Sequence, residues 1–227
     1  KNRGQTPNQR PHGFLLSHRV FRCNGGKSSH LPRPVLAVHR AGTRQLAGHY
    51  LPPQSALASI LGIDMLIAEQ WVLVTGGARG LGQSITRALA REGAGVVINY
   101  HHSDKAAAAL AEELGPRAMA LQADVTDTAA VHTLFAQAHE RTGQPISSVV
   151  NNALVGFQFD GDARPQIGDI AWQRFNQQIE GAVKGALNTL QAALPGMRSQ
   201  GFGRIVNVGT NLFQNPVVPY HDYTAAK

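Results

Sequence analysis

The stretch Thr75-Gly-Gly-Ala-Arg-Gly-Leu-Gly82 decides the fold. It lies between a short apolar run, residues 72–74, and a segment, residues 81–92, whose apolar side chains recur with helical spacing. Glycines let a chain turn tightly and bring its backbone close to a phosphate, and a helix that begins there directs free N–H groups at the anion. A glycine-rich turn is often only structural, but one between a strand and an amphipathic helix predicts a dinucleotide-binding loop.

Strands and helices alternate through the rest of the chain from Trp71 onward. Periodicity and turn residues predict further strands at 95–100, 118–121, 146–150 and 204–208, and helices at 104–114, 126–141 and 172–199. Such alternation predicts parallel βαβ units with right-handed crossovers. We therefore expect an α/β fold, a Rossmann-like doubly wound parallel sheet, over residues 65–227.

Residues 1–64 differ in character from the rest. They hold nine Lys or Arg against one acid, Asp64, and six of the twelve prolines, whereas residues 65–227 hold twelve basic and thirteen acidic residues. The net charge of +7 therefore does not indicate that the whole chain binds nucleic acid. We expect residues 1–64 to be a disordered basic segment. It is a gene-model artefact with the natural start at Met65, a targeting peptide, or an arm that binds nucleic acid or membrane.

Cysteine content and hydropathy bear on location. Cys23 is the one cysteine of the sequence, so an intrachain disulfide is excluded and a zinc site is not indicated. This suits the reducing cytoplasm, and no apolar run approaches the roughly 18 residues that span a membrane. We expect a cytoplasmic protein with a small-molecule substrate and without a metal, nucleic-acid or membrane partner.

The end of the strand at 95–100 indicates which dinucleotide binds. NAD-binding sheets usually carry an acid there, which binds the ribose 2′-hydroxyl and would repel a 2′-phosphate. This strand ends in Tyr100 and His101, and no acid lies between the strand and Asp104. Arg79 in the glycine loop could pair with that phosphate. Together these features predict NADP(H), although Arg79 alone could be a solvated loop residue.

A tyrosine and a lysine near the end of the sequence suggest the chemistry. Tyr223 precedes Lys227 by four residues, which places both side chains on one face of a helix. A phenol titrates at about 10, and an adjacent ammonium lowers that pKa. Tyr223 could then donate a proton as general acid while hydride adds to a carbonyl. Alone, the pair would indicate no more than a helix surface.

The motifs taken together resemble the classical short-chain dehydrogenase/reductase family, most closely its 3-oxoacyl-(acyl-carrier-protein) reductase type. They are the glycine loop, Asp124-Val125, Asn151-Asn-Ala153 and Tyr223-x-x-x-Lys227, in this order over residues 72–227. The resemblance implies contact of Asp124 with the adenine, binding of the nicotinamide ribose by Lys227, and a homotetramer in the full-length form. The implied cofactor-binding residues are Thr75, Gly76, Arg79, Gly80, Leu81, Gly82, Tyr100, His101, Asp124, Val125, Asn151, Ala153, Tyr223 and Lys227.

Some positions differ from the family pattern. Thr210 stands thirteen residues before Tyr223, where the family has a serine that bonds the substrate carbonyl; threonine keeps the hydroxyl, although Thr210 could merely end the strand. Leu154 replaces a glycine and either crowds the nicotinamide pocket or re-routes the loop. Ala182 stands where the family has a catalytic asparagine, and Gln178, one turn earlier, is a weak candidate to replace it.

The remaining expectations concern the substrate and the end of the chain. Loop 154–170 is longer than usual and offers Phe157, Phe159 and Arg164 to shape a substrate mouth. Because the family continues past Lys227, we expect the fold to be C-terminally incomplete, the strand at 204–208 to have an exposed edge, and this chain to bind NADP(H) weakly and turn over slowly. The function expected of the full-length form is NADPH-dependent reduction of a ketone, a 3-oxoacyl thioester or similar. The alternatives are a non-catalytic NADP(H)-binding protein and a polyanion-binding protein that uses residues 1–64.

Overall fold

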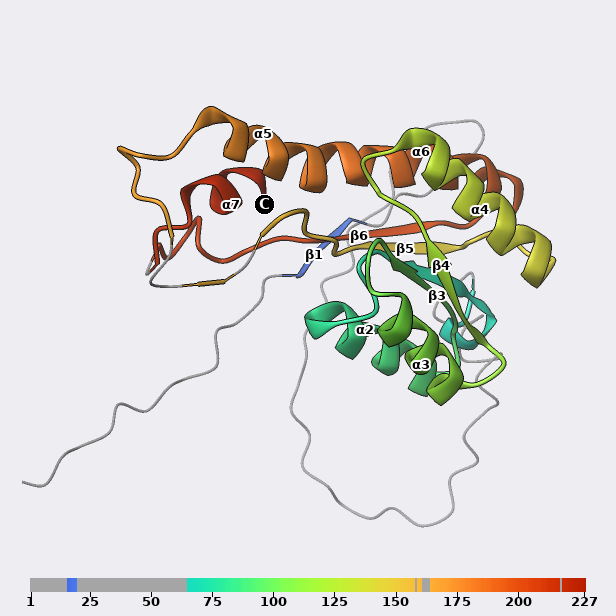
Figure 1. Ribbon diagram of the computed structural model, residues 1–227. Helices are drawn as coiled ribbons and strands as arrows, with labels where there is room; N and C mark the ends of the chain where they lie inside the picture. Colours follow the sequence, from blue (N-terminus) through green and yellow to red (C-terminus); the bar gives the residue numbers. More distant parts are fainter. Residues whose placement is uncertain (1–15, 20–64, 158, 161–163, 217) are drawn as a thin grey trace, which may run out of the picture.

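A six-stranded sheet with helices on both faces forms the described part of the chain (Figure 1). The computed structural model describes residues 16–19, 65–157, 159–160, 164–216 and 218–227. The strands are β1 (Leu16–Arg19), β2 (Trp71–Val74), β3 (Gly95–Tyr100), β4 (Ala118–Gln122), β5 (Ser148–Asn151) and β6 (Arg204–Val208). The helices are η1 (Ile67–Glu69), α2 (Gly80–Arg91), α3 (Asp104–Leu114), α4 (Thr128–Thr142), α5 (Trp172–Ile179), the π turn η2 (Glu180–Lys184), α6 (Gly185–Ser199) and α7 (His221–Ala226).

The strand order shows a doubly wound sheet. The order is β1-β6-β5-β2-β3-β4, and β2 to β6 are parallel to one another. The chain moves from β2 through β3 to β4 in one direction and then crosses to β5 on the other side of β2. Sheets of this class bind their ligands at such a reversal, which here lies beyond the carboxyl ends of β2 and β5. The predicted Rossmann-like fold of the region is thereby confirmed.

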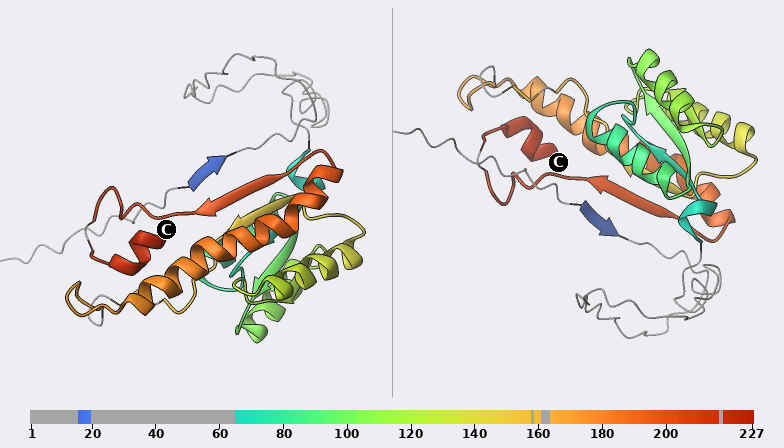
Figure 2. Two further views of the ribbon diagram at one scale, coloured as in Figure 1. Left: turned by 90° about the horizontal axis from the view of Figure 1, so that it is seen from above. Right: turned by 90° about the horizontal axis from the view of Figure 1, so that it is seen from below.

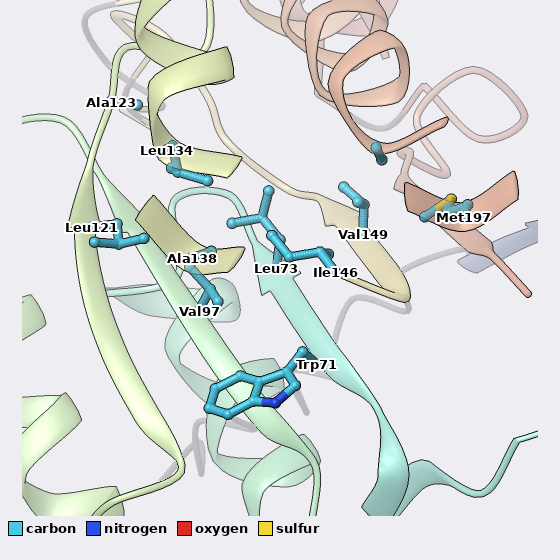
Figure 3. Packing of buried hydrophobic residues seen from close by; sticks show 11 residues of the cluster. Trp71, Leu73, Val97, Leu121, Ala123, Leu134, Ala138, Ile146, Val149 and Met197 are labelled. Carbon is cyan, nitrogen blue, oxygen red and sulfur yellow. The ribbon is translucent and has the colours of Figure 1, made fainter. Parts of the chain in front are cut away.

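Alternate strand residues serve opposite faces of the sheet. Val72 and Val74 pack with Val96 in a cluster that includes the apolar face of α2. Leu73 instead belongs to the cluster covered by α4 and α6, whose members Figure 3 shows with Trp71 at the lower edge of the group. Helices α2 and α3 therefore lie on one face, and α4 and the long α5–α6 rod on the other (Figure 1).

The segment predicted as one helix over 172–199 is interrupted. A π turn, η2, separates α5 from α6, and two loops approach the helix at this turn and directly after it. A Cβ on Gly181 would be 2.9 Å from Val155, and one on Gly185 would be 2.9 Å from Val125. The two glycines let the loops after β5 and β4 reach the helix backbone, and single π turns of this kind recur at functional sites.

The edge of β6 also differs from the expectation. Residues Leu16–Arg19 form β1, which pairs antiparallel with β6, so that Leu16 lies opposite Val208 and Arg19 opposite Ile205 (Figure 2). The expectation of an exposed edge is therefore wrong along residues 205–208. An extended segment can satisfy the free N–H and C=O groups of an edge strand, whatever its place in the sequence. The rest of segment 1–64, with its three suggested origins and its polyanion-binding alternative, lies outside the described residues.

Candidate active site

The glycine loop joins β2 to α2 and is tied to the neighbouring strand. Gly76 and Gly80 have φ angles of 61° and 54°, in the left-handed region that favours glycine. The Gly76 N–H donates to Asn99 Oδ1 at 3.3 Å, and the Gly77 N–H donates to the Asn99 carbonyl at 2.9 Å. A Cβ on Gly82 would overlap the Gly76 carbonyl oxygen and lie 2.7 Å from the amide nitrogen of Asn152. The start of α2 thus accepts no side chain there, as a backbone cradle for a pyrophosphate requires.

Thr75 links this loop to the segment after β5. Its hydroxyl donates to the Val150 carbonyl at 3.3 Å and accepts from the N–H groups of Asn152 at 2.9 Å and Ala153 at 3.1 Å. The side chain of Asn152 donates to the Thr75 carbonyl at 3.0 Å. The hydrogen bonds of Asn152 and Asn99 hold the glycine loop in place. Neither residue was identified from the sequence, because each bonds to backbone groups far away along the chain.

Two further expected cofactor residues are also held by other side chains. Asn151 donates to Asn207 Oδ1 at 2.9 Å and accepts from the Thr189 hydroxyl at 2.7 Å, so its amide joins β5, β6 and α6. The Val125 carbonyl accepts from Asn188 at 2.9 Å. Both residues therefore lie at the carboxyl edge of the sheet with their positions fixed from α6.

Asp124 and two histidines meet at the end expected to hold the adenine and its ribose. Partial burial opposes ionisation of Asp124, but hydrogen bonds from the Thr126 N–H and hydroxyl and the nearby His101 and His102 hold its pKa below the ordinary value. His101 Nε2 lies 4.0 Å from Asp124 Oδ2, and its ring stacks on His102 with centroids 3.6 Å apart. Arg79 is exposed in the glycine loop. No carboxylate follows β3 before Asp104.

The side chains of Tyr100 and Leu81 pack against the core on the face covered by α2 and α3. Tyr100 packs at the edge of the cluster under α3, and Leu81 packs in the cluster under α2. Because these side chains are used in the core, any contact of Tyr100 or Leu81 with the expected cofactor would be made by the backbone.

Tyr223 and Thr210 form a buried pair of hydroxyl groups. Each residue is 4% exposed, and the Thr210 hydroxyl acts on the Tyr223 phenol in the direction that lowers its pKa. The Thr210 oxygen accepts from the Leu212 N–H at 3.2 Å, which leaves its own proton to donate to Tyr223. Burial has the larger effect and raises the pKa of Tyr223 above its ordinary value. A substrate carbonyl at this point would meet both hydroxyls.

Lys227 follows α7 and points toward the end of β6. Its Nζ donates to the Val208 carbonyl at 3.1 Å, and burial lowers its pKa to about 8. The expected lowering of the Tyr223 pKa by this ammonium is wrong in the structure, because burial dominates that pKa and the hydroxyl of Thr210 is what opposes it. The Lys227 ammonium is instead directed at a backbone carbonyl.

Aromatic side chains from the long loop cover Tyr223. Phe157 stacks on its ring with centroids 4.6 Å apart, and Phe159 and Tyr220 pack edge-on against Phe157 at 4.8 and 5.4 Å. Beside them is an open cavity of about 230 Å³, whose lining includes Phe157, Arg164, Arg174, Tyr220 and Asp222. The loop thus brings Phe157 and Arg164 to the wall of this cavity, whereas Phe159 is not among the lining residues.

The structure also places the positions that depart from the family pattern. Gln178 is 4% exposed and donates to the Val155 carbonyl at 2.9 Å, so its amide holds the loop rather than facing the two hydroxyls. Ala182 lies in the π turn, and Leu154 is 39% exposed. Leu154 therefore turns outward, and the chain re-routes through Gly156, whose φ is 61°.

Within the described ranges, no group of three or more His, Cys, Asp or Glu side chains could hold a metal ion. In the same ranges, no helix is long and apolar enough to cross a membrane.

A doubly wound sheet with a glycine cradle at the carboxyl edge of its strands is the arrangement with which sheets of this class bind dinucleotides. The sequence profile of the short chain dehydrogenase family matches residues 70–227, and the chain belongs to this family. It is 30% identical over 186 residues to the NADPH-dependent aldehyde reductase 2, chloroplastic, of Arabidopsis thaliana. This match covers 76% of this chain and 67% of the relative.

Two bacterial relatives are also similar. The chain is 34% identical to the acetoacetyl-CoA reductase of Paracoccus denitrificans, over 68% of this chain and 60% of the relative. It is 34% identical to a 3-oxoacyl-[acyl-carrier-protein] reductase of Staphylococcus aureus, over 61% of this chain and 54% of the relative. A solved structure, a blue fluorescent protein from a metagenomic library in complex with NADPH, matches with a TM-score of 0.60 and 30% identity over 72% of this chain and 65% of its own. The chain thus spans 54–67% of the length of these curated relatives.

The lowered pKa of Lys227 leads to a pH prediction. Above about pH 8 the buried ammonium loses its proton, so we expect the dissociation constant for NADPH to rise with pH through this value. Titration of Lys227→Met by fluorescence should show weaker binding without this rise, whereas Lys227→Arg keeps the charge and should move the rise beyond the accessible range. Equal pH profiles for the original protein and Lys227→Met would contradict the assignment.

Burial of Lys227 also affects folding. Between about pH 8 and the ordinary lysine pKa of 10.5, the unfolded chain holds the Lys227 proton and the folded chain does not. The contribution of this group to the free energy of unfolding therefore rises with pH across that window.

Proposed function

We propose that the protein reduces a ketone to an alcohol with NADPH, and that Tyr223 is the general acid. The observation that carries the proposal is the buried hydroxyl pair of Thr210 and Tyr223. It follows β6 at the carboxyl edge of the sheet, the edge from which the glycine loop also departs. Membership of the short chain dehydrogenase family supports an oxidoreductase that acts on small molecules.

The residues fit a bound dinucleotide. Because the cradle at Gly82 accepts no Cβ, the backbone of residues 75–82 can approach a pyrophosphate, and Lys227 would bind the nicotinamide ribose. Bound NADPH supplies the hydride. As the carbonyl carbon gains it, negative charge develops on the oxygen, where Tyr223 transfers its proton and Thr210 holds a hydrogen bond. The raised pKa of Tyr223 keeps the phenol protonated before hydride reaches the carbonyl, and the negative charge that then develops on the substrate oxygen draws the proton.

The cofactor is NADP(H), and Arg79 is the proposed selector of its 2′-phosphate. The absence of a carboxylate at the end of β3 and the two histidines there support this. The proposed substrate is a 3-oxoacyl thioester or a similar small ketone, since relatives named acetoacetyl-CoA reductase and 3-oxoacyl-[acyl-carrier-protein] reductase match this chain over most of its length.

Cofactor preference in turnover tests the proposal. With acetoacetyl-CoA as substrate, NADPH should be oxidised in preference to NADH, and Arg79→Gln should lower that preference roughly 10- to 100-fold because a charge-assisted hydrogen bond is lost. Arg91→Gln, at the other end of α2, is the matched control and should keep the original preference. Oxidation of both cofactors at equal rates would overturn the cofactor assignment, and no oxidation with any ketone would overturn the reductase proposal.

A second candidate function is NADP(H) binding without turnover. The alanine at position 182, where the family has an amide, and the stacking of Phe157 on Tyr223 favour it. The intact pairing of Tyr223 with Thr210 favours the reductase instead. Binding of NADPH without oxidation by any carbonyl compound is the result that would distinguish this candidate.

Assembly and location are also proposals. A stripe of exposed apolar side chains runs along α5, η2 and α6 at Trp172, Ile179, Val183 and Leu187, and burying such a stripe supports a homotetramer of the full-length form. The single cysteine supports a reducing compartment, the cytoplasm.

A further inference from the structure

Asp222 is a buried carboxylate directly before the proposed acid. Its side chain is 3% exposed, and both of its oxygens are used. Oδ1 accepts from the backbone N–H of Tyr223 at 2.9 Å, and Oδ2 accepts from Arg174 Nε on α5 at 3.1 Å. One side chain therefore connects the backbone of Tyr223 to a helix that lies 48 residues earlier in the sequence.

The helix that carries Tyr223 needs such a connection. Helix α7 has six residues, and a helix of this length is not stable on its own. It packs against α5 (Figure 2), and Arg174 and Asp222 form an ion pair between the two elements. Arg174 is 47% exposed, so it remains hydrated while its Nε compensates the carboxylate. The pair can therefore fix α7 without burying two charges.

We propose that Asp222 and Arg174 are positioning residues, which hold α7 so that the Tyr223 hydroxyl stays against Thr210. This rests on the proposed function, in which those two hydroxyls meet the substrate carbonyl. Without the carboxylate charge, the N–H of Tyr223 and the guanidinium of Arg174 lose their common partner. The Tyr223 hydroxyl then moves away from the Thr210 hydroxyl. Misplacement of a reacting group by about 1 Å can cost roughly 100-fold in rate.

A double-mutant cycle on the titration of Tyr223 tests the proposal without turnover. The sequence has four tyrosines, so the ultraviolet difference between each protein and its Tyr223→Phe version isolates the one phenol. Thr210→Val removes the donor and should raise the Tyr223 pKa. In the Asp222→Asn background, Thr210→Val should raise it by less than half as much, because the two hydroxyls are already apart.

An equal rise in both backgrounds would overturn the proposal, since a through-space effect of the Asp222 charge is additive with the loss of the hydroxyl. If Asp222→Asn fails to fold by circular dichroism, the same cycle with Arg174→Gln decides the question. Asp222→Asn should also lower kcat roughly 10- to 100-fold with the KM for NADPH changed by less than about twofold. Arg87→Gln, which breaks the exposed pair with Glu113, is the matched control and should leave both constants unchanged.

The two proposals fail separately. A kcat within about twofold of the original for folded Asp222→Asn would overturn the positioning role. That role is also overturned if kcat, NADPH affinity and the melting temperature all fall together, which is the pattern of a merely structural pair. If the original protein oxidises no NADPH with any ketone, the proposed function fails, and the titration cycle still decides the role of Asp222.

Discussion

Replacing Tyr223 with phenylalanine should lower kcat for ketone reduction about 100- to 10,000-fold, the usual contribution of a general acid. The change removes one oxygen from a residue that is 4% exposed and stacks on Phe157, and phenylalanine keeps both the volume and the stack. The loss should therefore fall on the chemical step and leave the melting temperature and the dissociation constant for NADPH nearly unchanged. Steady-state kinetics with fluorescence titration of NADPH measures both.

The matched control is Thr133→Val, which removes an exposed hydroxyl from α4 far from the site. It should keep the original kcat. If Tyr223→Phe keeps more than about a tenth of the original kcat, Tyr223 is not the general acid.

Replacing Gly82 with alanine should remove NADPH binding. The added Cβ would overlap the Gly76 carbonyl oxygen and crowd the Asn152 amide nitrogen, and both are parts of the backbone turn at the proposed pyrophosphate site or of its support. The Gly76 oxygen belongs to the backbone, so the turn itself must shift. We expect the dissociation constant to rise at least about 100-fold, as loss of two or more hydrogen bonds to a charged group implies.

Gly168→Ala is the comparison for this variant. A Cβ at Gly168 meets no atom within 4 Å, so the same chemical change without a clash should leave NADPH affinity unchanged in isothermal titration. Equal affinities for Gly82→Ala and Gly168→Ala would contradict the placement of the pyrophosphate on residues 75–82.

Local signals along the chain predicted most of the fold. Helical spacing located α2, α3 and α4, and in the structure Asp127 caps α4 by accepting a hydrogen bond from the Ala130 N–H. The glycine loop and the order of strands predicted the doubly wound sheet, because connections between parallel strands have few allowed paths. These features depend on residues that are neighbours in sequence.

The supports of the site could not be predicted in the same way. Asp222 and Arg174 are ordinary surface residue types, and only the folded chain shows that one is buried against the other. The stack of Phe157 on Tyr223 and the pairing of β1 with β6 likewise join segments that no local period relates. The π turn lies beside Gly181 and Gly185, where Val155 and Val125 come close to the helix backbone, and this proximity is tertiary rather than local in sequence.

Reduction of a ketone by bound NADPH is tested most directly by a single turnover with identification of the product. The protein loaded with NADPH is mixed with acetoacetyl-CoA, the loss of reduced nicotinamide is followed by absorbance, and the product is identified by mass. We predict one 3-hydroxyacyl thioester for each NADPH oxidised, and almost none with Tyr223→Phe at equal cofactor loading. Bound NADPH that stays reduced with every ketone offered would contradict the proposed reaction and identify a protein that binds the cofactor without using it.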